Sequence, residues 1–220
     1  ALKQRHALAY DTESSMIQAE YVLQQLNEIT KGEAIATTGV GQHQMWAAQY
    51  IDFKHPRTFL TSGTMGTMGF GLPAAIGAQF ASPNRTVVLV SGDGSFMMNL
   101  QELATVARCR LPIKMVLLDN QALGMVRQWQ ELFYDRRFAE TPLSDRPNLV
   151  KLADAYGCLG LRADTVEELD AVIDQALANG KGPTIVDVRI RRQEKVYPMV
   201  AAGTTNDKII VDPTQGEGGH

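Results

Sequence analysis

Two nearly continuous apolar segments constrain the fold of this chain more than any other feature of its sequence. They are RTVVLVSGDG, residues 85–94, and IKMVLLDNQ, residues 113–121. Such runs are typical of parallel strands covered on both faces, because a strand with one solvated face alternates apolar and polar residues. The segment between them, residues 99–110, is amphipathic and fits a crossover helix. Together the three segments predict a β-α-β unit.

The rest of the chain repeats this alternation of strand and helix. We expect further strands at residues 34–39, 57–63, 158–163 and 182–190, and helices at residues 15–29, 43–51, 66–81, 123–134, 148–157 and 165–180. This order indicates an α/β fold, a doubly wound parallel sheet of about six strands with helices on both faces. We expect residues 1–15 to be a linker or domain entry, residues 16–190 to form one domain, and residues 191–220 to be a tail without regular period.

The composition excludes several classes of protein. The chain has 220 residues, of which 45% are hydrophobic, and a formal net charge of −3. Its basic residues are scattered, so we expect no nucleic-acid partner. Neither a membrane-spanning run nor a signal peptide is evident, so we expect no membrane partner and a cytoplasmic location. Cys109 and Cys158 lack the spacing of a zinc site, and we expect them to be buried free thiols.

Glycine-rich and polar residues follow four of the predicted strands, in TTGVGQ, TSGTMG, SGDGS and LDNQALG. Ligands of doubly wound sheets bind beyond the carboxyl ends of the strands, so these junctions should line one edge. Asp93 and Asn120 follow adjacent strands and lie 27 residues apart. A carboxylate, a carboxamide oxygen and the backbone carbonyl of Ala122 form one face of an octahedral oxygen site. Mg²⁺ favours such a site when phosphate oxygens and water complete its shell.

The neighbours of Asp93 suit an anion. Gly92 and Gly94 allow close approach of the backbone, and a helix that starts at Ser95 would offer free N–H groups. An ordinary turn would explain GDG alone, and another would explain DN alone. The pairing of these two motifs at the ends of two apolar strands favours a metal–phosphate site. His43 is the histidine best placed to meet a ligand there, although a lone histidine is more often structural or merely exposed.

These motifs resemble those of a known family. GDGSFMMNLQEL followed by LLDNQALGMVRQW resembles the metal–diphosphate motif of thiamin-diphosphate enzymes. With TTGVGQHQMWAAQY and GTMGTMGFGLPAAIGAQ, the chain resembles the acetohydroxyacid synthase (acetolactate synthase) catalytic subunits over about residues 12–207. The resemblance implies that thiamin diphosphate and Mg²⁺ are cofactors, and that Asp93, Asn120 and the Ala122 carbonyl are the metal ligands. It also implies that the tail at residues 191–220 closes over the site.

The resemblance further implies which residues meet the cofactor. Through side chain or backbone these are Val40, Gly41, Gln42, His43, Gly66, Met68, Gly92, Asp93, Gly94, Ser95, Asn120, Ala122, Gly124 and Met125. Gln42 and His43 would contact the diphosphate, together with backbone at residues 40–41 and 94–95. With no lysine or arginine assigned there, the metal would neutralise most of the diphosphate charge.

Three side chains would meet the reacting groups, namely Met68, Met125 and Trp129. The Gly66 carbonyl would accept from the amino group of the cofactor, and Met68 would wedge beneath its two rings; by sequence alone Met68 could also be a core methionine. Met125 and Trp129 lie four residues apart on one helix face that Phe133 continues, a spacing that equally fits a core stripe. The resemblance instead puts Met125 against the cofactor and Trp129 in the pocket for a second 2-ketoacid.

The activity implied is the condensation of pyruvate with pyruvate or 2-ketobutyrate, in branched-chain amino acid synthesis. The matching part is about the last third of a catalytic subunit, so the activating glutamate would come from the N-terminal domain of a neighbouring subunit. The resemblance implies a homodimer or larger oligomer, FAD in a further domain, a possible regulatory subunit, and a plastid location in a photosynthetic eukaryote. We expect the chain alone to be inactive. The alternatives are another thiamin-diphosphate 2-ketoacid decarboxylase, a glyoxylate carboligase, or a non-catalytic Mg²⁺-binding assembly module.

Overall fold

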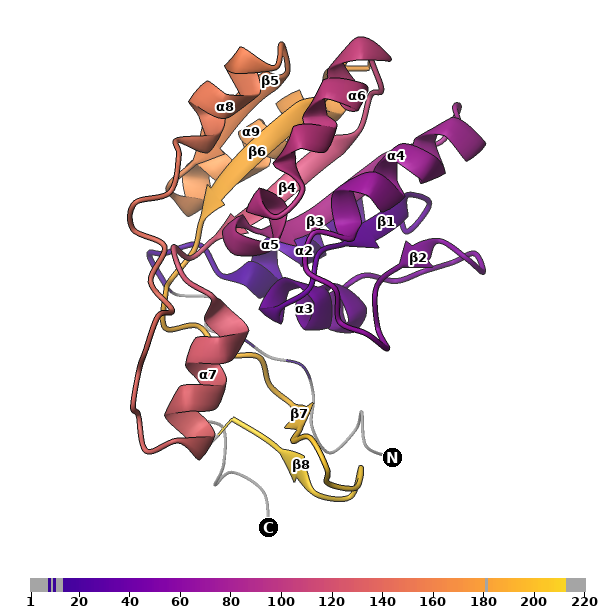
Figure 1. Ribbon diagram of the computed structural model, residues 1–220. Helices are drawn as coiled ribbons and strands as arrows, with labels where there is room; N and C mark the ends of the chain where they lie inside the picture. The colour runs from indigo at the N-terminus through magenta and orange to yellow at the C-terminus, as the bar shows by residue number, and fades with distance from the viewer. Residues whose placement is uncertain (1–7, 9, 11–13, 181, 213–220) are drawn as a thin grey trace.

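Six parallel strands form a central sheet in the part of the chain that the computed structural model describes, residues 8, 10, 14–180 and 182–212 (Figure 1). The strand order is β2-β1-β3-β4-β6-β5. The bounds are β1 Ile35–Thr38, β2 Phe59–Leu60, β3 Val87–Gly92, β4 Lys114–Asp119, β5 Leu159–Ala163 and β6 Thr184–Arg189. The predicted doubly wound α/β sheet is therefore confirmed.

Helices cover both faces of this sheet (Figure 1). One face carries α2 (Ala19–Thr30), α3 (Gln42–Tyr50) and α9 (Val166–Ala178). The other face carries α4 (Gly71–Ala81), α5 (Asp93–Met97), α6 (Leu103–Arg108) and α8 (Leu149–Ala155). Helix α7 (Gly124–Phe133) projects beyond the sheet, and the short pair β7 (Met199–Val200) and β8 (Ile209–Ile210) lies beside it at the bottom of Figure 1.

The apolar runs in β3 and β4 exist because both faces of these strands are buried. Val88 and Val90 belong to the core cluster beneath α2, α3 and α9, whereas Val87 and Leu89 belong to the cluster beneath α4, α6 and α8. In β4 the alternate residues divide in the same way. Since neither face meets water, the middle positions of both strands are apolar, and polar residues stand only at the ends, such as Lys114 and Asp119 of β4.

The order of the strands creates a crevice between β1 and β3. From β1 the chain moves outward to β2, whereas from β3 it moves the other way, to β4. The connections at this point leave the sheet in opposite directions, and in open α/β sheets ligands bind in the resulting gap. The loops that follow β1, β3 and β4 meet at this edge.

Several local predictions were wrong. The helix predicted from residue 66 begins at Gly71, because Gly66 (φ 62°) and Gly69 (φ 85°) adopt left-handed conformations that a right-handed helix cannot include. The crossover helix is divided into a 3₁₀ turn, Leu100–Glu102, and α6. The strand predicted at residues 57–63 contains only Phe59–Leu60.

Predictions at the ends of the chain have mixed outcomes. Most of the predicted linker, residues 1–7, 9 and 11–13, and the tail after residue 212 lie outside the described residues. Cys158 is buried, but Cys109 is exposed, so the expectation of a buried thiol was wrong there. No helix in the described ranges is both long and apolar enough to cross a membrane.

Candidate functional site

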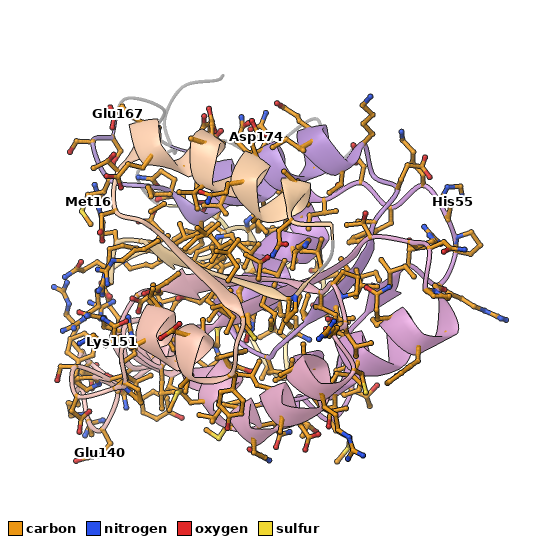
Figure 2. The ribbon with its side chains drawn as sticks, turned by 90° about the horizontal axis from the view of Figure 1, so that it is seen from above. Met16, His55, Glu140, Lys151, Glu167 and Asp174 are labelled. Atoms are coloured by element: carbon orange, nitrogen blue, oxygen red, sulfur yellow. The ribbon has the colours of Figure 1, made fainter. Side chains whose placement is uncertain are left out.

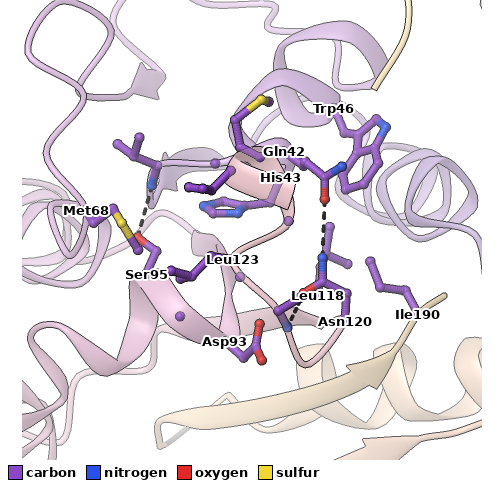
Figure 3. Close-up of a pocket in the computed structure, with 18 residues that line it drawn as sticks. Gln42, His43, Trp46, Met68, Asp93, Ser95, Leu118, Asn120, Leu123 and Ile190 are labelled. Carbon is purple, nitrogen blue, oxygen red and sulfur yellow. Dashed lines mark hydrogen bonds between the residues drawn. The ribbon is translucent and has the colours of Figure 1, made fainter. Parts of the chain in front are cut away.

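A pocket opens at the carboxyl edge of the sheet, where the loops after β1, β3 and β4 converge (Figure 3). Most of the residues predicted to meet a cofactor line it: Val40, Gly41, Gln42, His43, Met68, Gly92, Asp93, Gly94, Ser95, Asn120, Ala122, Gly124 and Met125. Gly66 and Trp129 are not among the lining residues. Residues from four loops that are distant in the sequence thus come together at one edge.

Asp93 is the first residue of α5 and is almost fully buried, with 1% of its surface exposed. Neither carboxylate oxygen has a hydrogen-bond partner among the described residues, and the nearest cation is Arg146, whose Nε lies 3.4 Å from Oδ2. Burial raises the pKa of Asp93, the Asp119 carboxylate raises it further, and Arg146 opposes the rise. Burying a carboxylate that accepts no hydrogen bonds is costly, and a bound cation would add to the compensation that Arg146 provides.

Asn120, which follows β4, has a fixed orientation. Its Oδ1 accepts a hydrogen bond from the backbone N–H of Ala122 at 3.0 Å, and its Nδ2 donates to Gln42 Oε1 at 3.2 Å (Figure 3). Next to it, the backbone of Gln121 and Leu123 is hydrogen-bonded to residues 141–143, which fixes the loop that carries Ala122. Oxygens of the kind that Mg²⁺ prefers therefore lie in a rigid loop.

His43 explains the need for glycine at two nearby positions. Its ring is buried, and burial lowers its pKa to about 3, so the imidazole is neutral at pH 7. A Cβ atom at residue 92 would lie 2.9 Å from His43 Nδ1, and one at residue 39 would lie 2.8 Å from Nε2. Nε2 has no hydrogen-bond partner in the described chain. A neutral ring with a free nitrogen is thus available at the site.

The hydroxyl of Ser95 joins two loops. It accepts hydrogen bonds from the backbone N–H group of Val40, at 3.0 Å (Figure 3), and from that of Gly69, at 3.1 Å. Helix α5 was predicted to start at Ser95 but begins at Asp93. Ser95 therefore holds the loop after β1 against the turn that carries Met68.

The stripe on α7 is not a core stripe within this chain. Met125 lines the pocket, whereas Trp129 is 42% exposed and Phe133 is 45% exposed. The alternative of a buried core face is therefore wrong for these two aromatic residues. Their exposure leaves an apolar helix face open beside the pocket.

Sequence reasoning missed a second group of pocket residues and a buried cation. The additional lining residues are Trp46, Leu118, Leu123, Val126 and Ile190. Arg146, from the polar loop before α8, has its side chain 8% exposed and pairs with Asp119 as well as Asp93. The sequence contained one signal: Asp119 ends an apolar strand, and a buried carboxylate there requires a positive partner.

The donor set restricts what could bind. Within the described ranges, no group of three or more His, Cys, Asp or Glu side chains could hold a metal ion. A cation beside Asp93 must therefore take its other ligands from the amide oxygen of Asn120, from backbone carbonyls, and from an anionic ligand or water. Mg²⁺ accepts that arrangement, whereas Zn²⁺ prefers several nitrogen or sulfur ligands.

Comparison with known proteins gives a consistent result. The acetolactate synthase isozyme 2 large subunit of Escherichia coli (strain K12) is 50% identical over 209 residues, which are 95% of this chain and 38% of that protein. An acetolactate synthase of Mycobacterium leprae (strain TN) is 47% identical over 94% of this chain and 34% of its own length. The chloroplastic acetolactate synthase 1 of Nicotiana tabacum is 46% identical over 98% of this chain and 33% of its own length.

The chain thus spans about a third of the length of the curated relatives it matches. A family profile described as thiamine pyrophosphate enzyme, C-terminal TPP binding domain, matches residues 39–188, which include β3, β4 and the loops that follow β1, β3 and β4 at the pocket. That match extends over more than half of the chain. The chain therefore belongs to the thiamine pyrophosphate enzymes, as a C-terminal TPP-binding domain.

Proposed function

We propose that this chain is the cofactor-binding part of a carboligase that condenses pyruvate with pyruvate or 2-ketobutyrate. The products would be acetolactate or acetohydroxybutyrate, for branched-chain amino acid synthesis. Identity of 46–50% to acetolactate synthases over nearly the whole chain supports this activity. The observation that carries the proposal is Asp93, whose buried carboxylate oxygens accept no hydrogen bond from the described residues, beside Asn120 at the topological switch point.

In this proposal the pocket residues have different roles in binding. Asp93, Asn120 and the carbonyl of Ala122 would hold Mg²⁺, which would neutralise the charge of the diphosphate of thiamin diphosphate. Arg146, with its Nε 3.4 Å from Oδ2, favours the charged form of the Asp93 carboxylate. The neutral His43 ring and Gln42 stand next to the diphosphate.

Much of the pocket lining is apolar. Met68, Met125, Trp46, Leu118 and Ile190 contribute to it. When bound, thiamin diphosphate supplies an electron sink for the decarboxylation of a 2-ketoacid and for carbon–carbon bond formation. We propose that Gly66 binds the amino group of the cofactor through its carbonyl, and that Trp129 sets the size of the acceptor pocket.

Other parts of the proposal concern the whole protein. We propose that a glutamate from the N-terminal domain of a neighbouring subunit activates the cofactor, that the enzyme is at least a homodimer, and that it binds FAD in a further domain. A regulatory subunit is a further proposed partner. The location would be the cytoplasm, or the plastid in a photosynthetic eukaryote; a chloroplastic relative supports the second.

Calorimetric titration with thiamin diphosphate at saturating Mg²⁺ tests the binding role. Asp93→Ala should weaken binding by more than the roughly 10- to 100-fold that loss of an outer contact costs. The matched control is Asp174→Ala, on the exposed surface of α9 (Figure 2), which should bind like the wild type. If the wild type binds no cofactor, or Asp93→Ala binds equally well, the proposal is wrong and a non-catalytic assembly module is favoured.

Two activity measurements test the reaction. The purified 220-residue chain should form no acetolactate from pyruvate with thiamin diphosphate and Mg²⁺, and formation of product would contradict the shared-site proposal. In the active enzyme that carries this chain, Trp129→Leu should change the preference between pyruvate and 2-ketobutyrate as acceptor. An unchanged preference would favour a simple decarboxylase or a glyoxylate carboligase.

A further inference from the structure

A continuous set of hydrogen bonds joins the segment after β6 to the candidate cation site. Gln128, on α7, is fully buried. Its Oε1 accepts from the backbone N–H of Val196 at 2.9 Å, and its Nε2 donates to the backbone carbonyl of Val196 at 3.1 Å. Gln42 Nε2 donates to the same Oε1 at 2.9 Å, and Gln42 Oε1 accepts from Asn120 Nδ2 at 3.2 Å. Three side-chain amides thus connect the backbone of Val196 to Asn120.

The first end of this connection fixes which way the amides of Gln128 and Gln42 point. A backbone N–H can only donate and a backbone carbonyl can only accept, so Val196 determines the positions of the oxygen and nitrogen of Gln128. Gln42 must then turn its nitrogen toward Gln128. The backbone carbonyl of Glu194, 2.7 Å from that nitrogen, requires the same orientation.

The hydrogen bonds of Asn120, at the other end, fit the same orientation of the amides. With its nitrogen facing Gln42, Asn120 has its oxygen on the opposite side, where the backbone N–H of Ala122 donates to it at 3.0 Å. Asn120 and Gln42 are 7% and 3% exposed, so water does not compete strongly for these groups. A buried network whose members all have partners holds a single arrangement.

The segment that carries Val196 has further attachments. Lys195 Nζ lies 2.9 Å from a carboxylate oxygen of Glu131, and Gln49 Nε2 donates to the backbone carbonyl of Pro198 at 3.1 Å. Val196 itself is fully buried in the core. Loss of the Gln128 amide alone should therefore leave this segment in place while removing one of the two acceptors that orient the Gln42 amide, with only the Glu194 carbonyl remaining.

We propose that Gln128 is a positioning residue, which acts through Gln42 to keep the carboxamide oxygen of Asn120 turned toward the bound cation. The proposal rests on the cation site proposed above and adds to it a residue that lies outside the pocket lining. It assigns a function to the buried polar residue of α7, whose neighbours on that helix are partly or largely exposed. The segment at residues 194–199 then influences the orientation of Asn120 through Gln128 and Gln42.

The variant Gln128→Met removes the amide while keeping a side chain of similar length. The matched control is Gln79→Met, since Gln79 is equally buried and donates to the backbone carbonyls of Ser82, Pro83 and Arg85 at the opposite edge of the sheet. Both variants should lower the melting temperature. Only Gln128→Met should weaken binding of Mn²⁺ in the presence of thiamin diphosphate, by about 10- to 100-fold, measured from the loss of the free-Mn²⁺ resonance signal.

A second measurement needs no metal. In two-dimensional NMR spectra of the chain, the side-chain NH₂ signals of Asn120 and Gln42 should shift in Gln128→Met and stay unchanged in Gln79→Met. If Gln128→Met does not fold, Gln128→Asn, whose shorter side chain cannot reach both partners, is judged by the same criteria. Unchanged Asn120 signals, or equal loss of Mn²⁺ affinity in both glutamine variants, would overturn the proposal. Failure of the wild type to bind Mn²⁺ would contradict the cation site, while the NMR signals still decide the role of Gln128.

Discussion

Glu20 lies on the inner face of α2, with 7% of its surface exposed and one carboxylate oxygen without a hydrogen-bond partner in the described chain. Burial raises its pKa to about 7. The charges of Glu194 and Asp212 add to the rise, while its own backbone N–H and the Trp46 side chain oppose it. Tyr50 faces the same carboxylate. This acid is therefore uncharged in the folded protein over part of the range in which the unfolded chain is ionised.

The pKa shift of Glu20 predicts a specific pH dependence of stability. The folded protein holds the proton up to about pH 7 and the unfolded chain only up to about pH 4.5, so the free energy of unfolding falls as the pH rises between these values. Glu20→Gln should remove this loss. Its free energy of unfolding should exceed that of the wild type by up to about 3 kcal/mol at pH 8, and by little at pH 4. Urea unfolding at both pH values measures the difference. Glu28→Gln, an exposed change on the same helix, should show no such pH dependence.

Gly124 is a second residue whose role is visible only in three dimensions. A Cβ atom there would lie 2.0 Å from Gln42 Oε1 and 2.5 Å from Asn120 Nδ2. Gly124→Ala should therefore break the hydrogen bond between these amides. It should lower the free energy of unfolding, measured with urea, by about 1–3 kcal/mol. Gly77→Ala is the control, because a Cβ atom in that helical position meets nothing within 4 Å. The free energy of unfolding of Gly77→Ala should rise by about 0.5–1 kcal/mol. Equal losses of stability in the two variants would contradict the prediction.

Elements were predictable from the sequence where burial alone decides their structure. β3 and β4 are buried on both faces and therefore have uninterrupted apolar sequences, and α9 carries a capping box between Thr165 and Glu168. The turn before α4 was not predictable in this way. Its small apolar residues suit a helix, but Gly69, in a left-handed conformation, is hydrogen-bonded to Ser95 and Asn99, which lie more than 25 residues away in the sequence.

In the candidate site, the position of Arg146 likewise could not be predicted from the sequence. The loop that carries it has no periodic pattern, and its course is fixed by backbone hydrogen bonds from Leu123 to Thr141 and from Leu143 to Gln121. Asp93 and Asn120 could be predicted because both follow apolar strands of one β-α-β unit. A cation that reaches them from a distant irregular loop leaves no comparable spacing in the sequence.

The loop before α8 should therefore contribute strongly to stability. Arg146→Met would leave Asp93 buried without its cation and Asp119 paired with Arg189 alone, so we expect a loss of about 3–5 kcal/mol in the free energy of unfolding. Arg137→Met is the control, since that side chain is 74% exposed on the preceding turn and should change stability by less than about 1 kcal/mol. Chemical denaturation at neutral pH measures both. Equal effects would mean that the buried acids find other partners.

At the scale of the whole molecule, the surface retains large apolar side chains. Met65 is 84% exposed and Met98 is 54% exposed, and Met98 packs beside Gly69 in the turn that carries Met65. Trp129 and Phe133 are exposed on α7, beside the pocket. Exposed apolar groups of this size are typical of interaction surfaces. Both groups lie near the edge of the sheet at which a second subunit is proposed to complete the site.

This surface predicts that the chain self-associates. Sedimentation velocity at increasing concentration should show dimers or larger species, and the double change Met65→Lys and Met98→Lys should shift them toward monomer because it places two like charges on the apolar turn. Glu167→Lys, on the exposed start of α9 (Figure 2), alters the charge elsewhere and should leave association unchanged. A wild-type chain that stays monomeric at every concentration would contradict the prediction.

The two tryptophans give the molecule an optical property of its own. Trp46 is 1% exposed and lines the pocket, whereas Trp129 is 42% exposed on α7. A dissolved collisional quencher such as iodide should therefore extinguish the longer-wavelength emission of Trp129 first. The remaining fluorescence should come from Trp46, which lines the pocket. The chain thus contains its own reporter of what enters that pocket, and no dye or label has to be attached.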